Sequence, residues 1–196
     1  MEILFTDKIK AAISFAIQTH EVDQQQKRKG KQIPYVTHPL VVGMILARAG
    51  ASENVVVAGI LHDTIEDSIA AKKVSREMIA EFFGELVAEL VMSVTEADKR
   101  LSWEERKREA IEHIKTFSHD SLLVKSGDVI SNTSDIVEDF ARNGAAIFER
   151  FAASKERTVE HYLQVIAAIL AAWPEIPLTG DLEALARKLE AIRQTF

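Results

Sequence analysis

The segment that most constrains this chain is Val55–Asp67, where an uncharged run leads directly into a group of ionisable residues. Its first part, Val55–Leu61, carries seven residues without a charge and has the composition of a buried helix. The ionisable residues that follow are His62, Asp63, Glu66 and Asp67. Moving charged groups into a core is unfavourable unless they are paired or bind a metal. The segment therefore predicts either a helix that leaves the core for solvent or a helix that ends at a metal.

Helical spacing relates these ionisable residues to one another. Glu66 follows His62 by four positions and Asp63 by three, so the three side chains would share one helical face. We therefore expect one central helix over residues 52–67, with a carboxylate-rich stripe at its end. Neighbouring residues project about 100° apart on a helix, so His62 and Asp63 cannot enclose an ion alone. Further ligands must come from other helices.

The remaining chain also has helical periodicity. No alternating strand pattern is convincing, so we predict the fold class all-α. Capping residues, glycines and prolines mark the ends of the expected helices. These cover residues 6–20, 37–49, 52–67, 75–94 with an interruption at Gly84, 102–115, 119–142, 145–152, 155–172 and 182–192. A polar, basic connector, Lys27–Lys31, lies between the first two.

Composition narrows the class of protein. A chain of 196 residues with 47% hydrophobic content predicts one domain, residues 1–172, and a C-terminal helical extension, residues 173–196, packed on it. The absence of cysteine excludes a disulfide framework, a thiolate zinc site and a cysteine nucleophile. A net charge of −6 argues against DNA or RNA as a partner. No apolar run approaches a membrane span and no signal segment is recognisable, so we expect a cytoplasmic protein without a membrane partner. The sequence does not decide the oligomeric state, and a homodimer is one of the alternatives.

Two further stretches carry the same chemistry as the central helix. Pro34–Leu40 places His38 in the first turn of a helix, and Val124–Asn132 places Asp128 inside a largely apolar one. Gly127 weakens that helix by roughly 1 kcal/mol relative to alanine, which indicates close approach of another backbone or a ligand. The candidate donors are His38, His62, Asp63 and Asp128. This mixed nitrogen and oxygen set suits Mn²⁺, Fe²⁺, Zn²⁺ or another first-row metal better than Ca²⁺.

These stretches, in this order, resemble the metal-dependent HD phosphohydrolase superfamily. Within it they are most similar to the hydrolase domain of RelA/SpoT-type enzymes and to the stand-alone small alarmone hydrolases, including the metazoan SpoT homologues. The sequences that carry the resemblance are Pro-Tyr-Val-Thr-His-Pro, Ala-Gly-Ile-Leu-His-Asp-Thr-Ile-Glu-Asp and Val-Lys-Ser-Gly-Asp-Val-Ile-Ser-Asn. The resemblance implies a single HD-domain helical bundle of about eight to ten helices.

The resemblance also implies a role for each site residue. The metal ligands would be His38, His62, Asp63 and Asp128, with Mn²⁺ as the first candidate. Glu66 and Asp67 match the acidic pair that positions and activates the attacking water. Asn132 matches a nucleotide contact, Arg28 matches an arginine that packs on the nucleobase, with Lys27 and Lys29 as alternatives, and Tyr162 matches a pocket wall. Lys125 shares a helical face with Asp128 and would either neutralise phosphate charge or pair with a carboxylate.

The implied activity is removal of the 3′-pyrophosphate from guanosine 3′,5′-bis(diphosphate), (p)ppGpp, to give GDP or GTP and pyrophosphate. Two alternatives remain: hydrolysis of another phosphorylated nucleotide, such as a nucleoside monophosphate, (p)ppApp or NADPH, and nucleotide sensing without catalysis. The chain departs from the family at Val129 and after Asn132, where basic residues are usual, and this leaves the substrate open. We expect the other histidines, His20, His113, His119 and His161, to be ordinary surface or satisfied residues. Trp103 and Trp173 are expected to be packing residues.

Overall fold

The computed structural model describes residues 5–96 and 101–195. Over these ranges the regular structure is helical and contains no strand, which confirms the all-α prediction. The α-helices are α1 (Asp7–Ile17), α2 (Thr37–Arg48), α3 (Glu53–Leu61), α4 (Thr64–Asp67), α5 (Arg76–Phe83), α6 (Glu85–Val94), α7 (Trp103–Ile114), α8 (His119–Asn143), α9 (Lys155–Ala172) and α10 (Thr179–Gln194). A π-helical turn, η1 (Gln18–Val22), and two 3₁₀ segments, η2 (Ala70–Lys72) and η3 (Gly144–Arg150), complete the order.

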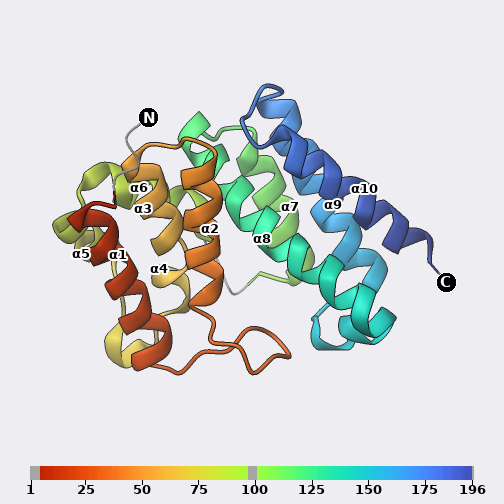
Figure 1. The fold of residues 1–196 in the computed structure, drawn as a ribbon, viewed down its shortest axis with the longest axis horizontal. Coiled ribbons are helices and arrows are strands. Elements are labelled where there is room, and N and C mark those ends of the chain that lie inside the picture. Colours follow the sequence, from red (N-terminus) through yellow and green to blue (C-terminus); the bar gives the residue numbers. More distant parts are fainter. Residues whose placement is uncertain (1–4, 97–100, 196) are drawn as a thin grey trace.

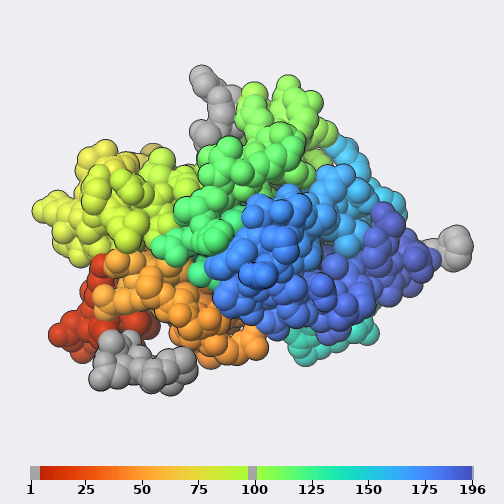
Figure 2. Space-filling model, turned by 90° about the horizontal axis from the view of Figure 1, so that it is seen from above, coloured from red at the N-terminus to blue at the C-terminus, as the bar shows by residue number. Residues whose placement is uncertain are grey.

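Helices α2, α3 and α8 pack on one another in the middle of the molecule (Figure 1). Helices α1, α5 and α6 lie on one side of this centre, and α7, α9 and α10 lie on the other. The space-filling view shows the same order, with the N-terminal elements at one end and α9 and α10 at the other (Figure 2). The bundle is therefore built around α3, whose residues Val55–Leu61 are all buried as their composition predicts.

The prediction of one continuous helix over residues 52–67 is wrong. Ser52 does cap the helix by accepting from the backbone N–H of Val55, but α3 ends at Leu61 and α4 begins at Thr64. His62 Nδ1 donates to the carbonyl of Gly59 at 2.8 Å, and the Thr64 hydroxyl donates to that of Leu61 at 2.7 Å. Residues 63 and 65 would use these two carbonyls in a continuous helix, so the side chains compete with the helical hydrogen bonds. The predicted stripe on one helical face is therefore replaced by a turn between two helices.

The C-terminal half shows smaller differences. The segment expected as a helix over residues 145–152 is the 3₁₀ segment η3, and the last helix begins before the predicted residue 182. Helix α10 buries Leu182, Leu185, Leu189 and Ile192 and packs on α8 and α9. This placement agrees with an extension packed on the same domain, while the boundary at residue 172 stays a prediction. None of the described helices combines the length and apolarity that a membrane crossing requires.

Three glycines allow α2 to approach α3 and α8 closely. A Cβ atom on Gly59 would lie 2.3 Å from Leu46 Cδ1, and one on Gly127 would lie 3.1 Å from Val42 Cγ1. A Cβ on Gly43 would meet Ile60 at 2.6 Å. The close approach that Gly127 indicated is therefore made by side chains of α2. This packing brings the start of α2 next to the end of α3 and the middle of α8.

We predict that Gly59→Ala lowers the free energy of unfolding by about 1–3 kcal/mol, because the added methyl group must displace Leu46 from a packed core. Gly180→Ala in α10 is the matched control. Nothing lies within 4 Å of its Cβ position, so we expect unchanged stability or a gain of up to about 1 kcal/mol. Urea denaturation measures both, and equal stability of the two variants would contradict the packing described.

Candidate functional site

The four predicted metal ligands lie together where α2, α3 and α8 meet. His38 Nε2 lies 3.4 Å from Asp128 Oδ1 and 3.6 Å from Asp63 Oδ2. His62 Nε2 lies 3.1 Å from Asp63 Oδ2 and 3.8 Å from Asp128 Oδ1. Among the described residues, donor atoms of His38, His62 and Asp128 form a group in which all lie within 4.8 Å of one another. Helix packing thus brings His38 and Asp128, the further candidate ligands, to the His62–Asp63 pair.

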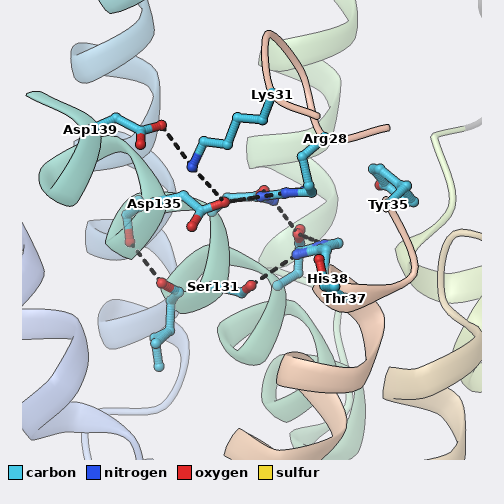
Figure 3. Close-up of polar contacts among 12 residues, drawn as sticks. Arg28, Lys31, Tyr35, Thr37, His38, Ser131, Asp135 and Asp139 are labelled. Carbon is cyan, nitrogen blue, oxygen red and sulfur yellow. Dashed lines mark hydrogen bonds and ion pairs between the residues drawn. The ribbon is translucent and has the colours of Figure 1, made fainter. Parts of the chain in front are cut away.

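The two histidines present the same ring nitrogen to this centre. The carbonyl of Gly59 can only accept, so His62 Nδ1 carries its proton and Nε2 has a free lone pair when the ring is neutral. His38 Nδ1 is hydrogen-bonded to Ser131 Oγ at 2.9 Å (Figure 3). His62 Nε2 is buried and makes no hydrogen bond. A buried, unsatisfied nitrogen among carboxylate oxygens is the environment that a divalent first-row metal ion would complete.

The charges of the cluster also favour a cation. Burial raises the pKa of Asp63, but His62 and His38 outweigh it and hold that pKa well below its usual range. For Asp128, burial is outweighed in the same way by Lys125 and both histidines, which hold its pKa low. Burial lowers the pKa of His62, yet Asp63 and Asp128 raise it to about 9. Without an ion, a proton on His62 therefore balances the ionised carboxylates, and a divalent cation would take the place of that proton on Nε2.

A second layer of polar groups orients the carboxylates. Lys125 Nζ donates to Asp128 Oδ2 at 2.9 Å, and Asn132 Nδ2 donates to Asp128 Oδ1 at 2.6 Å. The Tyr35 hydroxyl donates to Asp63 Oδ2. Of the two roles open to Lys125 from sequence, the structure favours the carboxylate partner. Tyr35 and Ser131 were not predicted from the sequence, although both lie within the motifs that carry the ligands.

The acidic pair Glu66 and Asp67 forms part of the single turn α4 that follows the ligands. Glu66 Oε2 accepts a hydrogen bond from the backbone N–H of Glu96 at 3.4 Å, just beyond α6. Asp67 Oδ2 accepts from Gln26 Nε2 at 2.9 Å, and Gln26 Oε1 in turn bonds His20 Nδ1 at 2.8 Å. Contacts from two other segments therefore hold the pair next to the ligand cluster.

A pocket of about 380 Å³ adjoins the cluster, and Arg28, Asn132 and Tyr162 line it as predicted. Lys125 does not line it. Its other lining residues include the basic side chains Lys29, Lys31, Arg106, Lys107 and Arg150, the rings of Tyr35, Trp103, Phe151 and His161, and the carboxylate of Asp135. Tyr35 and Asn132 contact the ligands Asp63 and Asp128, so they connect the pocket to the cluster. Basic groups and rings together suit a molecule with phosphates and a flat base.

Within the basic connector, Arg28 and Lys31 are held against the protein, whereas Lys27, Lys29 and Gly30 are exposed. Arg28 Nη2 donates to Asn132 Oδ1 at 2.9 Å, and the guanidinium carbon lies 5.6 Å from the centre of the Tyr35 ring. Lys27 pairs with a glutamate of η1 at 3.3 Å and is not among the pocket residues, whereas Lys29 is. These positions favour Arg28 over Lys27 as the base-packing residue.

Two of the other histidines agree with the expectation of ordinary roles: His113 is exposed, and His119 stacks on Trp173 with ring centres 3.9 Å apart. His20 and His161 differ, because each has one buried ring nitrogen without a hydrogen bond, Nε2 in His20 and Nδ1 in His161. Burial lowers the pKa of His161 to about 3. His161 contacts Trp103 edge-on in the pocket wall. Packing of α7 on α9 creates this wall, and no local sequence signal marks it.

The site geometry agrees with the comparisons with known proteins. The sequence matches the HD domain family over residues 12–159. The chain belongs to the HD-domain family. It is 37% identical over 130 residues to guanosine-3′,5′-bis(diphosphate) 3′-pyrophosphohydrolase MESH1 of Xenopus tropicalis, covering 65% of this chain and 69% of that protein. The Danio rerio MESH1 is 36% identical over 126 residues, covering 63% and 66%.

One solved structure resembles this chain over nearly its whole length. It belongs to a metazoan orthologue of SpoT that is described as hydrolysing ppGpp. The two structures align with a TM-score of 0.71 and 27% sequence identity, covering 96% of this chain and 95% of the other. The resemblance inferred from the three motifs is thereby confirmed.

We predict that Mn²⁺ raises the melting temperature of the protein, because an ion that binds only the folded state stabilises it by about 2.7 kcal/mol at a hundredfold excess over its Kd. His62→Gln and Asp128→Asn should lose this shift, whereas His119→Gln, outside the cluster, should keep it. Calorimetry with Mn²⁺ or with a chelator measures the shift. A full shift in His62→Gln would contradict the assignment.

His161 predicts a pH dependence of stability. In the unfolded chain this residue binds a proton below its ordinary pKa of 6.5, whereas in the folded protein it stays neutral down to a pKa of about 3. The unfolded state thus binds more protons in this window, so the free energy of unfolding falls as pH falls, by up to about 1.4 kcal/mol per pH unit from this group. His161→Phe should flatten the dependence in metal-free protein, as measured by urea titrations. An unchanged slope would be the opposing result.

Proposed function

We propose that this chain is a metal-dependent hydrolase that removes the 3′-pyrophosphate from (p)ppGpp and yields GDP or GTP and pyrophosphate. The observation that carries the proposal is a cluster of two histidines and two aspartates that adjoins a basic, aromatic-lined pocket. A doubly phosphorylated guanosine offers charge for the basic side chains and a base for the rings. The MESH1 relatives, named for this reaction, support the same substrate.

His38, His62, Asp63 and Asp128 would hold the divalent ion, and their mixed donor set supports Mn²⁺, with Fe²⁺ and Zn²⁺ as alternatives. When bound, such an ion lowers the pKa of water and polarises a phosphate oxygen. Lys125 and Asn132 engage both oxygens of Asp128 and so keep this ligand in one orientation. Lys125 additionally places a positive charge beside the site where phosphate would sit.

Glu66 and Asp67 would orient the attacking water and take its proton. They follow the ligands directly, and the contacts with Glu96 and Gln26 restrict their motion. Water attacks the phosphorus atom that is bonded to the 3′ oxygen. The bond between this phosphorus and the 3′ oxygen breaks, pyrophosphate leaves, and the 3′ oxygen takes up a proton. An acidic pair at this place would keep the proton transfer local.

The pocket residues would bind the nucleotide. Arg28 packs on the nucleobase, and Asn132 contacts the sugar or a phosphate. Burial, followed by the charge of Asp128, raises the pKa of Tyr162 to about 12. Its hydroxyl therefore stays protonated at neutral pH and can donate a hydrogen bond to a phosphate oxygen. A nucleotide substrate is consistent with a cytoplasmic protein that has no nucleic-acid or membrane partner. A homodimer is a separate expectation, which light scattering would test.

We predict that Mn²⁺-loaded protein releases pyrophosphate from ppGpp and that Asp63→Asn or exhaustive chelation abolishes this activity. Glu66→Gln and Asp67→Asn should lower kcat by about 10²–10⁴-fold, the usual range for losing a general base, while the Mn²⁺ shift in melting temperature persists. Glu138→Gln, an exposed residue of α8, is the control and should keep full activity. Full activity after chelation or in Asp63→Asn would refute the mechanism.

A nucleotide panel tests the substrate separately from the chemistry. We expect ppGpp to be hydrolysed with a higher kcat/KM than ppApp, GMP or NADPH, with pyrophosphate as the product. Pyrophosphate and orthophosphate are assayed in parallel. Preferential release of orthophosphate, or preference for another nucleotide, would keep the hydrolase and reject (p)ppGpp as its substrate.

A further inference from the structure

The connector that carries Arg28 depends on tertiary contacts for its shape. Residues 27–34 form a small hairpin closed by an antiparallel bridge between Lys27 and Pro34. Within it, the Arg28 N–H donates to the Ile33 carbonyl at 2.8 Å, and the Lys31 N–H donates to the Arg28 carbonyl at 2.9 Å. An isolated two-stranded hairpin is at best marginally stable in water. What orients Arg28 must therefore come from the surface on which the hairpin lies.

Helix α8 supplies that surface through two aspartates one helical turn apart. Asp135 Oδ2 accepts from Arg28 Nε at 3.2 Å and from Nη2 at 2.8 Å. Lys31 Nζ lies 3.6 Å from the same oxygen and 2.8 Å from Asp139 Oδ2, which also pairs with Arg150. Figure 3 shows Arg28 and Lys31 side by side above α8, with Asp135 next to both. The two aspartates thus bind the hairpin at Arg28 and at Lys31.

The guanidinium of Arg28 is held by hydrogen bonds from its nitrogens and by contact with an aromatic ring. Asp135 binds two of its nitrogens, Asn132 binds Nη2, and the Tyr35 ring lies against it. Asn132 and Tyr35 also hold ligands of the metal cluster, so the position of Arg28 is tied to that cluster. A long arginine side chain without these contacts would sample many rotamers.

We propose that Asp135 is a positioning residue that holds the Arg28 guanidinium in the orientation in which it packs on the nucleobase. This inference rests on the proposed function, because it requires a nucleotide in the pocket. Asp135 touches Arg28 and lines the pocket, whereas Asp139 pairs with Lys31 and does not line the pocket. Asp135 thereby acts on substrate binding through Arg28.

The exposure of the two aspartates separates this role from a purely structural one. The Asp135 side chain is 36% exposed, whereas that of Asp139 is 9% exposed. The Arg28 partner of Asp135 is 12% exposed, so this pair is partly buried, and ion pairs contribute less to the free energy of unfolding the more they are exposed. Loss of the Asp135 carboxylate is therefore expected to lower stability less than loss of Asp139 and to appear mainly in nucleotide affinity.

A double-mutant cycle on Mn²⁺-loaded protein tests the inference. Asp135→Ala should raise the KM for ppGpp about tenfold, the order expected for a charge-assisted hydrogen bond, with kcat within about twofold of the native value. Arg28→Ala should raise KM at least as much, and the double variant should be no worse than Arg28→Ala alone. Asp135→Asn keeps an acceptor oxygen and should lie between native protein and Asp135→Ala. If Asp135→Ala does not fold, Asp135→Asn replaces it in the double-mutant cycle.

Glu138→Ala is the matched control, since Glu138 is three residues from Asp135 on α8 and pairs with the exposed Arg142. It should leave KM and kcat unchanged. Additive effects of Asp135→Ala and Arg28→Ala, an unchanged KM, or an equal rise in KM from Glu138→Ala would overturn the inference.

Binding of GDP in the presence of Mn²⁺ separates this inference from the proposed activity. The same cycle is applied to the Kd of GDP by calorimetry, which needs no turnover. Coupling in the Kd without pyrophosphate release from ppGpp would support Asp135 and reject the proposed reaction. Pyrophosphate release with additive effects would reject Asp135 and support the reaction. If the native protein neither hydrolyses ppGpp nor binds GDP, the proposed reaction and the proposed role of Asp135 are both rejected.

Discussion

The interaction on which this structure depends is the meeting of two buried imidazoles with two ionised carboxylates at the end of α3. Such a group is unfavourable in a core unless positive charge completes it. The chain supplies that charge through Lys125, which binds Asp128, and, without an ion, through a proton on His62, whose pKa the two carboxylates raise to about 9. A divalent ion would replace this proton on the buried Nε2 atom. An apolar helix can end here because its final polar residues converge on this centre.

Close packing of α2 against α3 and α8 makes that convergence possible. Gly43, Gly59 and Gly127 leave room for side chains that a methyl group would displace. His38 at the start of α2 thereby reaches Asp128, ninety positions later in the sequence. The same helix α8 carries Asn132 and Asp135 toward the connector, so one rigid element orients both a candidate metal ligand and the candidate base-packing arginine. Metal site and pocket are consequently parts of one constellation.

How much the sequence predicted differs between the metal site and the pocket. The cluster of candidate ligands was predictable because each of them lies in a short motif whose residues are unusual for their surroundings, as with the carboxylate of Asp128 inside a largely apolar segment. The pocket wall was not, because Trp103, Arg106 and His161 lie on helices whose local pattern is that of ordinary exposed helices. The prediction of a continuous helix over residues 52–67 was wrong because hydrophobic periodicity does not show that the side chains of His62 and Thr64 donate hydrogen bonds to backbone carbonyls of the helix.

The sequence by itself determined the all-α class and the buried run Val55–Leu61 through composition and spacing, and it identified the four converging donors through the resemblance of three short motifs to the HD family. Only the tertiary structure decided that Lys125 pairs with Asp128, that Arg28 lies between Tyr35 and Asp135, and which basic side chains face the pocket. Helical periodicity assigns a residue to a face of its own helix. Which other helix meets that face depends on contacts between residues distant in the chain, and those contacts give the site its charge and shape.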